Sequence, residues 1–369
     1  MIRLAYLVLT GMANEFLDTA LIRHQIWLQG LATHEAKTFD PFLQKADRII
    51  RNVLSSYGDR IDSVKTMNEI IRQLKVELGA NYSEWGEELI GDMQEIAEAE
   101  AQFTSKTLDK AVVGRDVLTP APAQVWAAIN ARPIQISDKG ESNLMQPMIK
   151  GFTPNEVNRV NGVVRNGFYS GATIQDMITA IRGTKKNNFN DGVLITTRRS
   201  AETIARTSTN HVSNVARQST FKANQDILKG WEFTATLDIR TTTICRFNDG
   251  QIHPIGEGPI PPLHLGCRSS AIPVVKDKFD IFGDAGTRAS KGAKGGQQTT
   301  AKTYYEWLER QPKFFQQDVL GKAKTELFRK GGLSSEKFRK LTSDKFGQPL
   351  TLDEIKAKDA DAWREAGLD

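Results

Sequence analysis

Residues 236–273 read TLDIRTTTICRFNDGQIHPIGEGPIPPLHLGCRSSAIP, and this stretch decides how the fold is interpreted. It contains five of the thirteen prolines, both cysteines (Cys245 and Cys267) and two of the five histidines (His253 and His264). Proline lacks a backbone amide and glycine costs backbone entropy, so a segment rich in both cannot form a long helix. We therefore expect strands and ordered turns, held together by something other than a large apolar face.

The composition of the 369-residue chain is that of a globular protein, with 39% hydrophobic and 25% charged residues. Its length predicts two or three domains. The net charge of +5 suits contact with nucleic acid or an acidic partner, although many proteins that bind neither are as basic. Two cysteines are too few for a disulfide framework, which indicates synthesis in the cytoplasm.

An apolar run near the N-terminus, 4–9, superficially imitates a signal peptide. It has about half the length of a usual signal core and is far too short to span a bilayer. We interpret it as a buried strand or helix turn. No later segment is apolar enough for a membrane span, so we expect no membrane partner.

Apolar residues at helical spacing predict an N-terminal helical domain over 1–116. Its acidic cluster of Glu95, Glu98 and Glu100 is interpreted as a solvated face. Three helices are expected: 20–54 with a break or start at Pro41, 63–78 ended by Gly79, and 81–113 with a capping box of Asn81 and Glu84.

Pro120, Pro122 and Pro133, together with a polar run at 137–143, predict a linker over 117–150, followed by a second unit over 151–282. This unit is expected to combine helices with the strand-and-turn stretch. The first predicted helix of this unit starts at Thr153-Pro154. The second starts at Thr173, with Asp176 as its capping partner, and ends at Gly183. After a polar loop at 185–191, the third runs from 197 to 229.

Alternation of Phe233, Ala235 and Leu237 with polar residues predicts a half-buried strand, and the Asn248-Asp249-Gly250 sequence predicts a tight turn. A Gly/Lys-rich loop is expected over 283–300, mobile unless a partner orders it. The C-terminal segment, 301–369, returns to helices, predicted at 304–310, 314–329, 334–341 and after Leu352. The fold class predicted is α+β, mainly helical, with one small strand-and-turn module that carries the cysteines and histidines.

Cys245, His253, His264 and Cys267 offer ligand chemistry suited to a structural zinc ion, in the spacing C-x7-H-x10-H-x2-C. The H-x2-C half is tight enough for a metal, whereas the C-x7-H half matches no known knuckle. A Cys245–Cys267 disulfide and a set of buried side chains bonded to turn backbone are the alternatives. A Cys–His nucleophilic pair is less favoured, since no third orienting residue is evident.

Arg199, Arg206 and Arg217 project within about 20° of one direction on a helix that turns 100° per residue, flanked by Asn210 and Asn214. Such a stripe is suited to phosphate contacts with DNA. The alternatives are a solvated helix face and arginines paired with buried carboxylates such as Asp238.

Several motifs that carry catalysis are absent from the sequence. It contains no G-x4-G-K-[ST] loop, no H-E-x-x-H and no G-x-S-x-G. These absences argue against a P-loop ATPase, a zinc protease of that type and a lipase-like hydrolase. No active site is predicted, and the protein is not expected to be an enzyme or to need a cofactor other than the zinc ion considered above.

The stretch 238–273 resembles the signature of the phage head morphogenesis family, the Mu F-like minor head proteins. Upstream, 205–210 is similar to the family's Ala-Arg-Thr-Glu-x-Asn helix, with Ser208 in place of the glutamate. Downstream, 304–334 is similar to the family's segment in which Trp-Leu-x-x-Gln-Pro leads into a Leu-Gly and a basic helix. The chain lacks the extra cysteine of some members, which excludes a four-cysteine metal site. The matching residues are Asp238, Arg240, Thr241, Cys245, Asp249, Gly250, Pro261, Pro262, His264, Cys267, Arg268, Ser269 and Pro273.

The resemblance implies a minor structural protein of a tailed-phage head, made in the host cytoplasm and located in the capsid interior or at the portal vertex. Its implied partners are the portal protein and the major capsid protein, and its implied roles are head assembly and DNA packaging and delivery. Phage DNA is a further expected partner, with Arg199, Arg206, Arg217, Lys291 and Lys294 as predicted contacts. The alternatives are a zinc- or cysteine-dependent enzyme, since similar domains can be fused to toxins, and a nucleic-acid-binding module.

Overall fold

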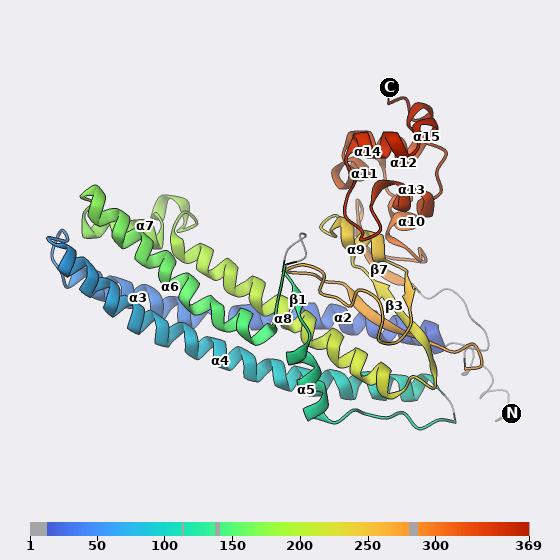
Figure 1. Cartoon of the computed structure of the whole chain (residues 1–369), viewed down its shortest axis with the longest axis horizontal. Helices are drawn as coiled ribbons and strands as arrows, with labels where there is room; N and C mark the ends of the chain where they lie inside the picture. The colour runs from blue at the N-terminus through green and yellow to red at the C-terminus, as the bar shows by residue number, and fades with distance from the viewer. Residues whose placement is uncertain (1–12, 113, 137–140, 280–286, 369) are drawn as a thin grey trace.

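The computed structural model describes residues 13–112, 114–136, 141–279 and 287–368. Long helices form an elongated bundle, a small β module lies at one end of it, and short C-terminal helices stand above that module (Figure 1). The α+β, mainly helical fold predicted from the sequence is confirmed. The apolar run at 4–9 lies outside the described residues.

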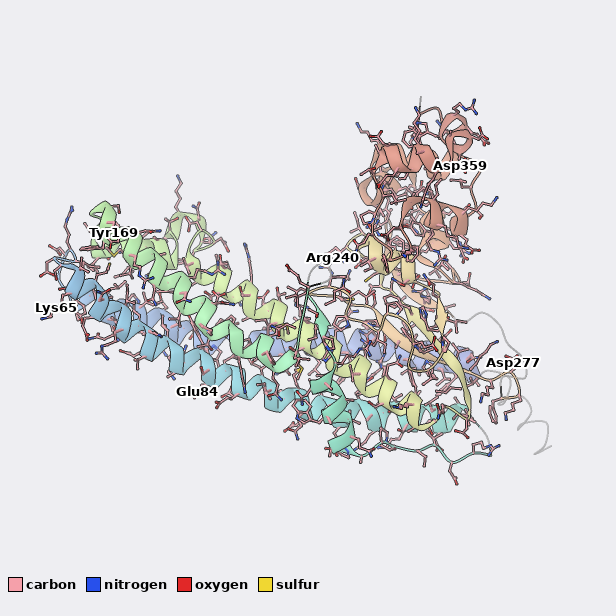
Figure 2. All side chains as sticks on the ribbon, viewed as in Figure 1. Lys65, Glu84, Tyr169, Arg240, Asp277 and Asp359 are labelled. Carbon is pink, nitrogen blue, oxygen red and sulfur yellow. The ribbon has the colours of Figure 1, made fainter. Side chains whose placement is uncertain are left out.

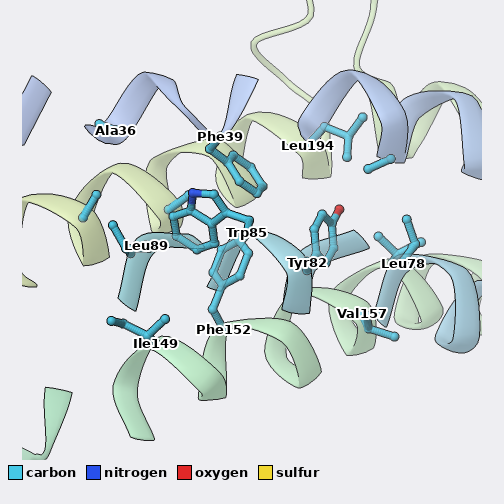
Figure 3. Close-up of a cluster of buried hydrophobic side chains, with 14 of the residues drawn as sticks. Ala36, Phe39, Leu78, Tyr82, Trp85, Leu89, Ile149, Phe152, Val157 and Leu194 are labelled. Carbon is cyan, nitrogen blue, oxygen red and sulfur yellow. The ribbon is translucent and has the colours of Figure 1, made fainter. Parts of the chain in front are cut away.

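The bundle consists of α2 (Ala13–Lys37), α3 (Asp40–Ser55), α4 (Val64–Ala111), α6 (Met145–Ser170), α7 (Ile174–Arg182) and α8 (Val193–Ala223). Its core includes aromatic side chains that interlock: Phe39, Tyr82, Trp85 and Phe152 pack edge-on or tilted, with ring centroids 4.8–5.9 Å apart (Figure 3). Burial of such large rings supplies much of the stability of a helical core. The core runs across the predicted division between 1–116 and 151–282, because α4 packs against both α6 and α8.

The predicted helix end at Gly79 and the predicted start at Asn81 are both wrong, since α4 continues without a break from Val64 to Ala111. A glycine inside a helix costs about 1 kcal/mol relative to alanine. Buried side chains on either side, including Leu78 and Tyr82, outweigh that cost. Asn81 does not cap a helix; its amide donates to the carbonyl of Phe42 over 2.9 Å.

The predicted start at Thr153-Pro154 is also wrong, since Pro154 lies inside α6. The helix begins at Met145 because Met145, Ile149 and Phe152 are buried in the bundle core. The predicted linker at 117–150 accordingly contains the first residues of α6, together with α5 (Pro122–Ala131), β1 (Ile134–Gln135) and β2 (Ser142–Asn143).

The predictions for α7 are confirmed: Thr173 and Asp176 form a capping box and Gly183 ends the helix. The polar loop after it contains a single 3₁₀ turn, η1 (Lys185–Asn187). The predicted helix 197–229 is α8, which ends earlier, at Ala223. Asn224 stops it by donating to the carbonyls of Thr220 and Leu118, both over 2.8 Å.

The module that follows α8 contains two three-stranded sheets and a short helix. In the first sheet, β3 (Leu228–Thr234) lies between β5 (Ile252–His253) and β6 (Ser270–Val275), and both pairings are antiparallel. In the second, β7 (Arg288–Gly292) lies between β4 (Leu237–Asp238) and β8 (Gly295–Thr299). The predicted single strand through Phe233 and Leu237 is thus divided between two sheets, and α9 (Thr243–Asn248) follows it.

The predicted Gly/Lys-rich loop is a β-hairpin over 288–299, because β7 and β8 pair antiparallel across five residues each. The part of that prediction at 283–286 lies outside the described residues. Beyond the hairpin, the C-terminal helices are α10 (Tyr304–Glu309), α11 (Lys313–Leu320), α12 (Lys322–Lys330), α13 (Ser335–Thr342), α14 (Leu352–Lys358) and α15 (Ala360–Glu365). The predicted helix 314–329 is two helices, separated at Gly321, whose φ of +78° no helix accommodates.

The C-terminal helices have their own aromatic core and are joined to α9 by arginines. Arg246 of α9 donates to the carbonyl of Val319 over 3.1 Å and lies over the ring of Tyr304. Arg339 of α13 donates to the carbonyl of Phe247 over 2.8 Å. None of the helices in the described ranges has both the length and the apolar run that crossing a bilayer requires.

Candidate functional site

The polar face of α8 binds the segment that leads into β6, and we call this contact the α8 seam. Thr207 Oγ1 accepts from the amide of Gly266 over 2.9 Å, and the Asn210 amide donates to the carbonyl of Ser269 over 3.0 Å. One helical turn further, Asn214 Oδ1 accepts from the amide of Ala271 over 2.8 Å. Residues at spacings of three and four lie on one helix face. The part of the predicted stripe from Asn210 to Arg217 therefore faces the module, whereas Arg199 is exposed and Arg206 is half-buried.

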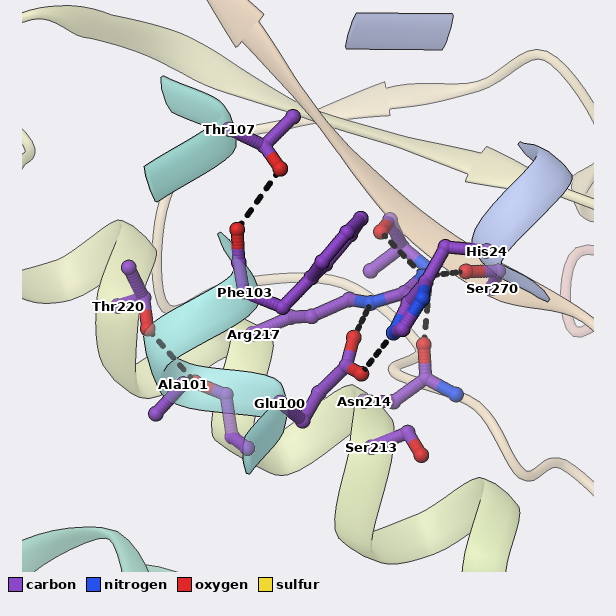
Figure 4. A network of polar contacts seen from close by, with 12 residues as sticks. His24, Glu100, Ala101, Phe103, Thr107, Ser213, Asn214, Arg217, Thr220 and Ser270 are labelled. Carbon is purple, nitrogen blue, oxygen red and sulfur yellow. Dashed lines mark hydrogen bonds and ion pairs between the residues drawn. The ribbon is translucent and has the colours of Figure 1, made fainter. Parts of the chain in front are cut away.

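A buried ion pair continues the seam (Figure 4). Arg217 has no exposed side-chain surface, and its Nε donates to Glu100 Oε1 over 2.5 Å. Its Nη1 donates to the hydroxyl of Ser270 in β6. The other oxygen of Glu100 lies 2.6 Å from His24 Nε2 of α2, whose ring stacks on Phe103. Four elements, α2, α4, α8 and β6, therefore meet at one guanidinium and one carboxylate.

Two predictions are corrected by this pair. Arg217 cannot contact DNA, and Glu100 is not part of a solvated face, since both are buried. For Arg217, helical spacing gave the direction that it shares with Asn210 and Asn214 but not the element that covers it. For Glu100, the prediction of a solvated side chain was wrong. The alternative of an arginine paired with a buried carboxylate describes Arg217, with Glu100 as the partner and not Asp238.

Asp238 has a partner of its own, Arg268. The guanidinium binds the carboxylate through two nitrogens, at 2.5 and 2.7 Å. The amide of Arg240 and the hydroxyl of Thr241 also donate to Asp238 Oδ1, over 3.0 and 3.2 Å. Burial raises the pKa of Asp238, but Arg268 and these donors outweigh burial and hold it below its usual value. The charged carboxylate of Asp238 therefore stabilises the turn after β4 and binds it to Arg268.

Asp249 and Gly250 shape the turn after α9. Asp249 accepts from both Nη atoms of Arg288 in β7, over 2.8 and 3.0 Å, and from the amide of Ala235 over 2.6 Å. Gly250 has a φ of +78°, and a Cβ there would lie 2.8 Å from Thr303 Cγ2. Conformation and space therefore both require glycine. Sequence reasoning missed Arg288, whose only signal was a single arginine in a region predicted as loop.

The cysteines and one histidine form a compact cluster. Cys245 Sγ of α9 lies 3.6 Å from Cys267 Sγ and 3.3 Å from His264 Nε2, and both sulfurs are buried. Burial raises the pKa of Cys267, but hydrogen bonds from Cys245 and His264 outweigh it and hold that pKa well below its usual value. The hydrogen bond to Cys267 and burial raise the pKa of Cys245. Two sulfurs and an imidazole this close together are suited to metal binding or disulfide formation, whereas burial shields both sulfurs from a large substrate.

His253 does not join the cluster, so the predicted four-ligand set is wrong in that position. It lies on β5 opposite Trp231, and the two rings are 4.9 Å apart. Strand pairing holds its side chain against Trp231, and it is not among the three residues whose ligand atoms lie within 4.8 Å of one another, which are Cys245, His264 and Cys267.

The remaining predicted contacts lie at the surface. Arg199, Lys291 and Lys294 are exposed, and Arg206 is half-buried. A groove lies between α2, α8 and the module, and its lining includes Arg206, Arg240, Arg268 and His264. The described residues that line this groove include no carboxylate. A second hollow shares Arg240 and Arg268 with this groove, and Lys291 and the carboxylate of Asp238 also line it. Figure 2 places Arg240 between the bundle and the C-terminal helices.

Comparison with known proteins identifies one family. Residues 158–272 match the family model described as Phage Mu protein F like protein. No curated protein and no solved structure matches the chain. The match runs from α6 to β6, so it contains the whole α8 seam and the cysteine–histidine cluster.

Removing the charge of Glu100 tests the ion pair. Burial raises the pKa of Glu100, but Arg217 and His24 outweigh it, so its pKa lies below the usual 4.5. A carboxylate with a depressed pKa stabilises the fold above its unfolded-state pKa, and this contribution is lost as the pH falls through the folded-state value. At pH 7 we expect Glu100→Gln to lower the free energy of unfolding by about 3–5 kcal/mol, because the charge of Arg217 remains buried without a partner.

Chemical denaturation at several pH values measures this effect. As the pH falls below the usual value of 4.5, the carboxyl of Glu100 takes up a proton in the unfolded wild type first, and in the folded protein only at its lower folded-state pKa. The difference between Glu100→Gln and the wild type therefore shrinks over this range of pH. Glu95→Gln is the matched control, since Glu95 is an exposed carboxylate on the same helix. Equal stability of Glu95→Gln and Glu100→Gln at pH 7 would contradict the assignment.

Proposed function

We propose that this chain, whose residues 158–272 belong to the phage Mu protein F-like family, is a minor head protein of a tailed bacteriophage. The family indicates phage head morphogenesis and a place in the virion. The finer proposal is a location in the capsid interior or at the portal vertex, with portal and major capsid proteins as partners. In that place the protein acts in head assembly and in the packaging and delivery of DNA.

The observation that carries the proposal is the family match itself, which covers the module and the helix that holds it. The structural role of the motif residues supports it. Asp238, Asp249 and Arg268 form internal ion pairs, and Gly250 shapes a turn. These residues hold the backbone of the module in place and are occupied with internal contacts. Such a role suits an assembly protein, and the family is structural rather than enzymatic.

DNA contact is the second part of the proposal. The groove lined by Arg206 and Arg240 joins the hollow that contains Lys291, because both are lined by Gln25, Gln29, Arg240 and Arg268. The side chain of Arg240 is 77% exposed. Such a cationic strip suits the phosphate backbone, which is bound through charge and without regard to sequence. Arg199 and Lys294 extend the exposed positive charge on α8 and on the β7–β8 turn.

Quantitative mass spectrometry of purified particles tests the location. We expect the protein to co-purify with portal and capsid proteins at a fixed ratio to the portal, both in filled heads and in heads purified before DNA packaging. Soluble protein from the same infected cells is the control for carry-over. Absence from particles, with the protein abundant in the soluble fraction, would overturn the proposal.

Salt-dependent binding to duplex DNA tests the cationic strip. The triple variant Arg206→Ala/Arg240→Ala/Lys291→Ala should bind DNA more weakly. Its plot of log K against log salt should be less steep than that of the wild type, by about 0.9 for each phosphate that the variant no longer neutralises. The matched control is Arg48→Ala/Arg165→Ala/Lys65→Ala, which removes the same charge from exposed positions of the bundle. An equal weakening in both triple variants would show a general charge effect, and no binding by the wild type would exclude DNA as a partner.

A further inference from the structure

The cysteine–histidine cluster has the spacing of a tetrahedral metal site. With metal–sulfur bonds of about 2.3 Å and metal–nitrogen bonds of about 2.0 Å, two sulfurs lie about 3.8 Å apart and a sulfur and a nitrogen about 3.5 Å apart. The measured separations are 3.6 Å between Cys245 Sγ and Cys267 Sγ, and 3.3 Å between Cys245 Sγ and His264 Nε2. All three ligand atoms lie within 4.8 Å of one another.

The tautomer of His264 is fixed by its backbone. Its Nδ1 lies 2.9 Å from the carbonyl oxygen of Leu265, which can only accept a hydrogen bond. A histidine binds a metal ion with a neutral ring. In that form of His264, Nδ1 carries the proton and Nε2 presents its lone pair toward Cys245. A carbonyl that orients the second ring nitrogen is a usual partner of metal-binding histidines.

The turn that holds two of the ligands is built and anchored. The amide of Cys267 donates to the carbonyl of His264 over 3.2 Å, and Gly266 between them has a φ of +69°. The amide of Gly266 is bound to Thr207 in the α8 seam. The third ligand, Cys245, comes from α9, which is 22 residues away in the chain. A metal ion here would join α9 to the turn that is docked on α8.

The electrostatic surroundings tolerate a cation. Arg268 follows Cys267 directly, but its charge is met by Asp238. The hydroxyl of Thr242 lies 3.0 Å from His264 Nε2, and a small hollow lined by Thr242, Arg240 and Gly266 adjoins the cluster. Cys245 and His264 also line that hollow, so a water molecule held there would be the fourth ligand beside the three protein ligands.

We propose that Cys245, His264 and Cys267 bind one zinc ion, which fastens α9 to the turn between His264 and Cys267. The chemistry of the ligands favours zinc, since two soft thiolates and an imidazole in tetrahedral spacing select it over hard cations. This proposal is independent of a place in the phage head, because it rests on the ligand geometry alone.

Metal analysis of the full chain tests the proposal. The protein is expressed in zinc-supplemented medium, purified under a phosphine reductant without chelator, and analysed by mass spectrometry for zinc. We expect one zinc ion per chain in the wild type and in His253→Gln, and a loss of most bound zinc in Cys245→Ser and Cys267→Ser. His253→Gln is the matched control, since His253 belongs to the same module but lies outside the cluster.

Cobalt substitution keeps the test valid if a cysteine variant does not fold. Wild-type protein reconstituted with Co²⁺ should show sulfur-to-cobalt charge transfer and the intense visible absorption of tetrahedral cobalt. Wild-type protein that binds neither metal would overturn the proposal, as would a zinc loss in His253→Gln equal to that in Cys267→Ser. A Cys245–Cys267 disulfide found in protein from intact particles would also overturn the proposal, because a covalent bond would then join α9 to the turn in place of a metal ion.

Discussion

The structure depends on one buried charge, the guanidinium of Arg217. Removing a charged group from water costs several kcal/mol unless a counter-charge and hydrogen bonds replace the lost solvation. Glu100 supplies the counter-charge, and Ser270 supplies a further hydrogen bond from β6. Any shift of α8 relative to α4 or β6 would leave this charge unpaired. The pair therefore fixes how the helical bundle and the β module fit together.

The rest of the module is arranged around that junction. Thr207, Asn210 and Asn214 hold the backbone of 266–271 against α8, and this segment ends in the strand β6. The same segment carries Arg268, which clamps Asp238, and Cys267, which faces Cys245. The residues that match the family motif thus lie together because one helix face binds one stretch of backbone.

The sequence predicted the parts of this arrangement that depend on local patterns. The polar stripe of α8, the capping box at Thr173 and the absence of a long helix over 236–273 follow from helical spacing and from backbone chemistry. The breaks predicted at Gly79 and Pro154 failed because burial of the flanking side chains outweighs a local helix preference. Long-range partners could not be seen in the sequence: Glu100 and Arg217 are 117 residues apart, and the strand pairing of β5 places His253 against Trp231.

Hydrogen exchange measured by mass spectrometry on the native protein tests most directly whether the seam makes bundle and module one unit. The amides of Gly266 and Ala271 are bonded to α8 side chains, so they should open only when α8 opens. We expect peptides covering 266–275 and 207–217 to exchange with the same opening free energy and to lose protection together on addition of denaturant. Exchange of 266–275 at clearly lower free energy, with 207–217 still protected, would show that the module unfolds alone and would contradict this account.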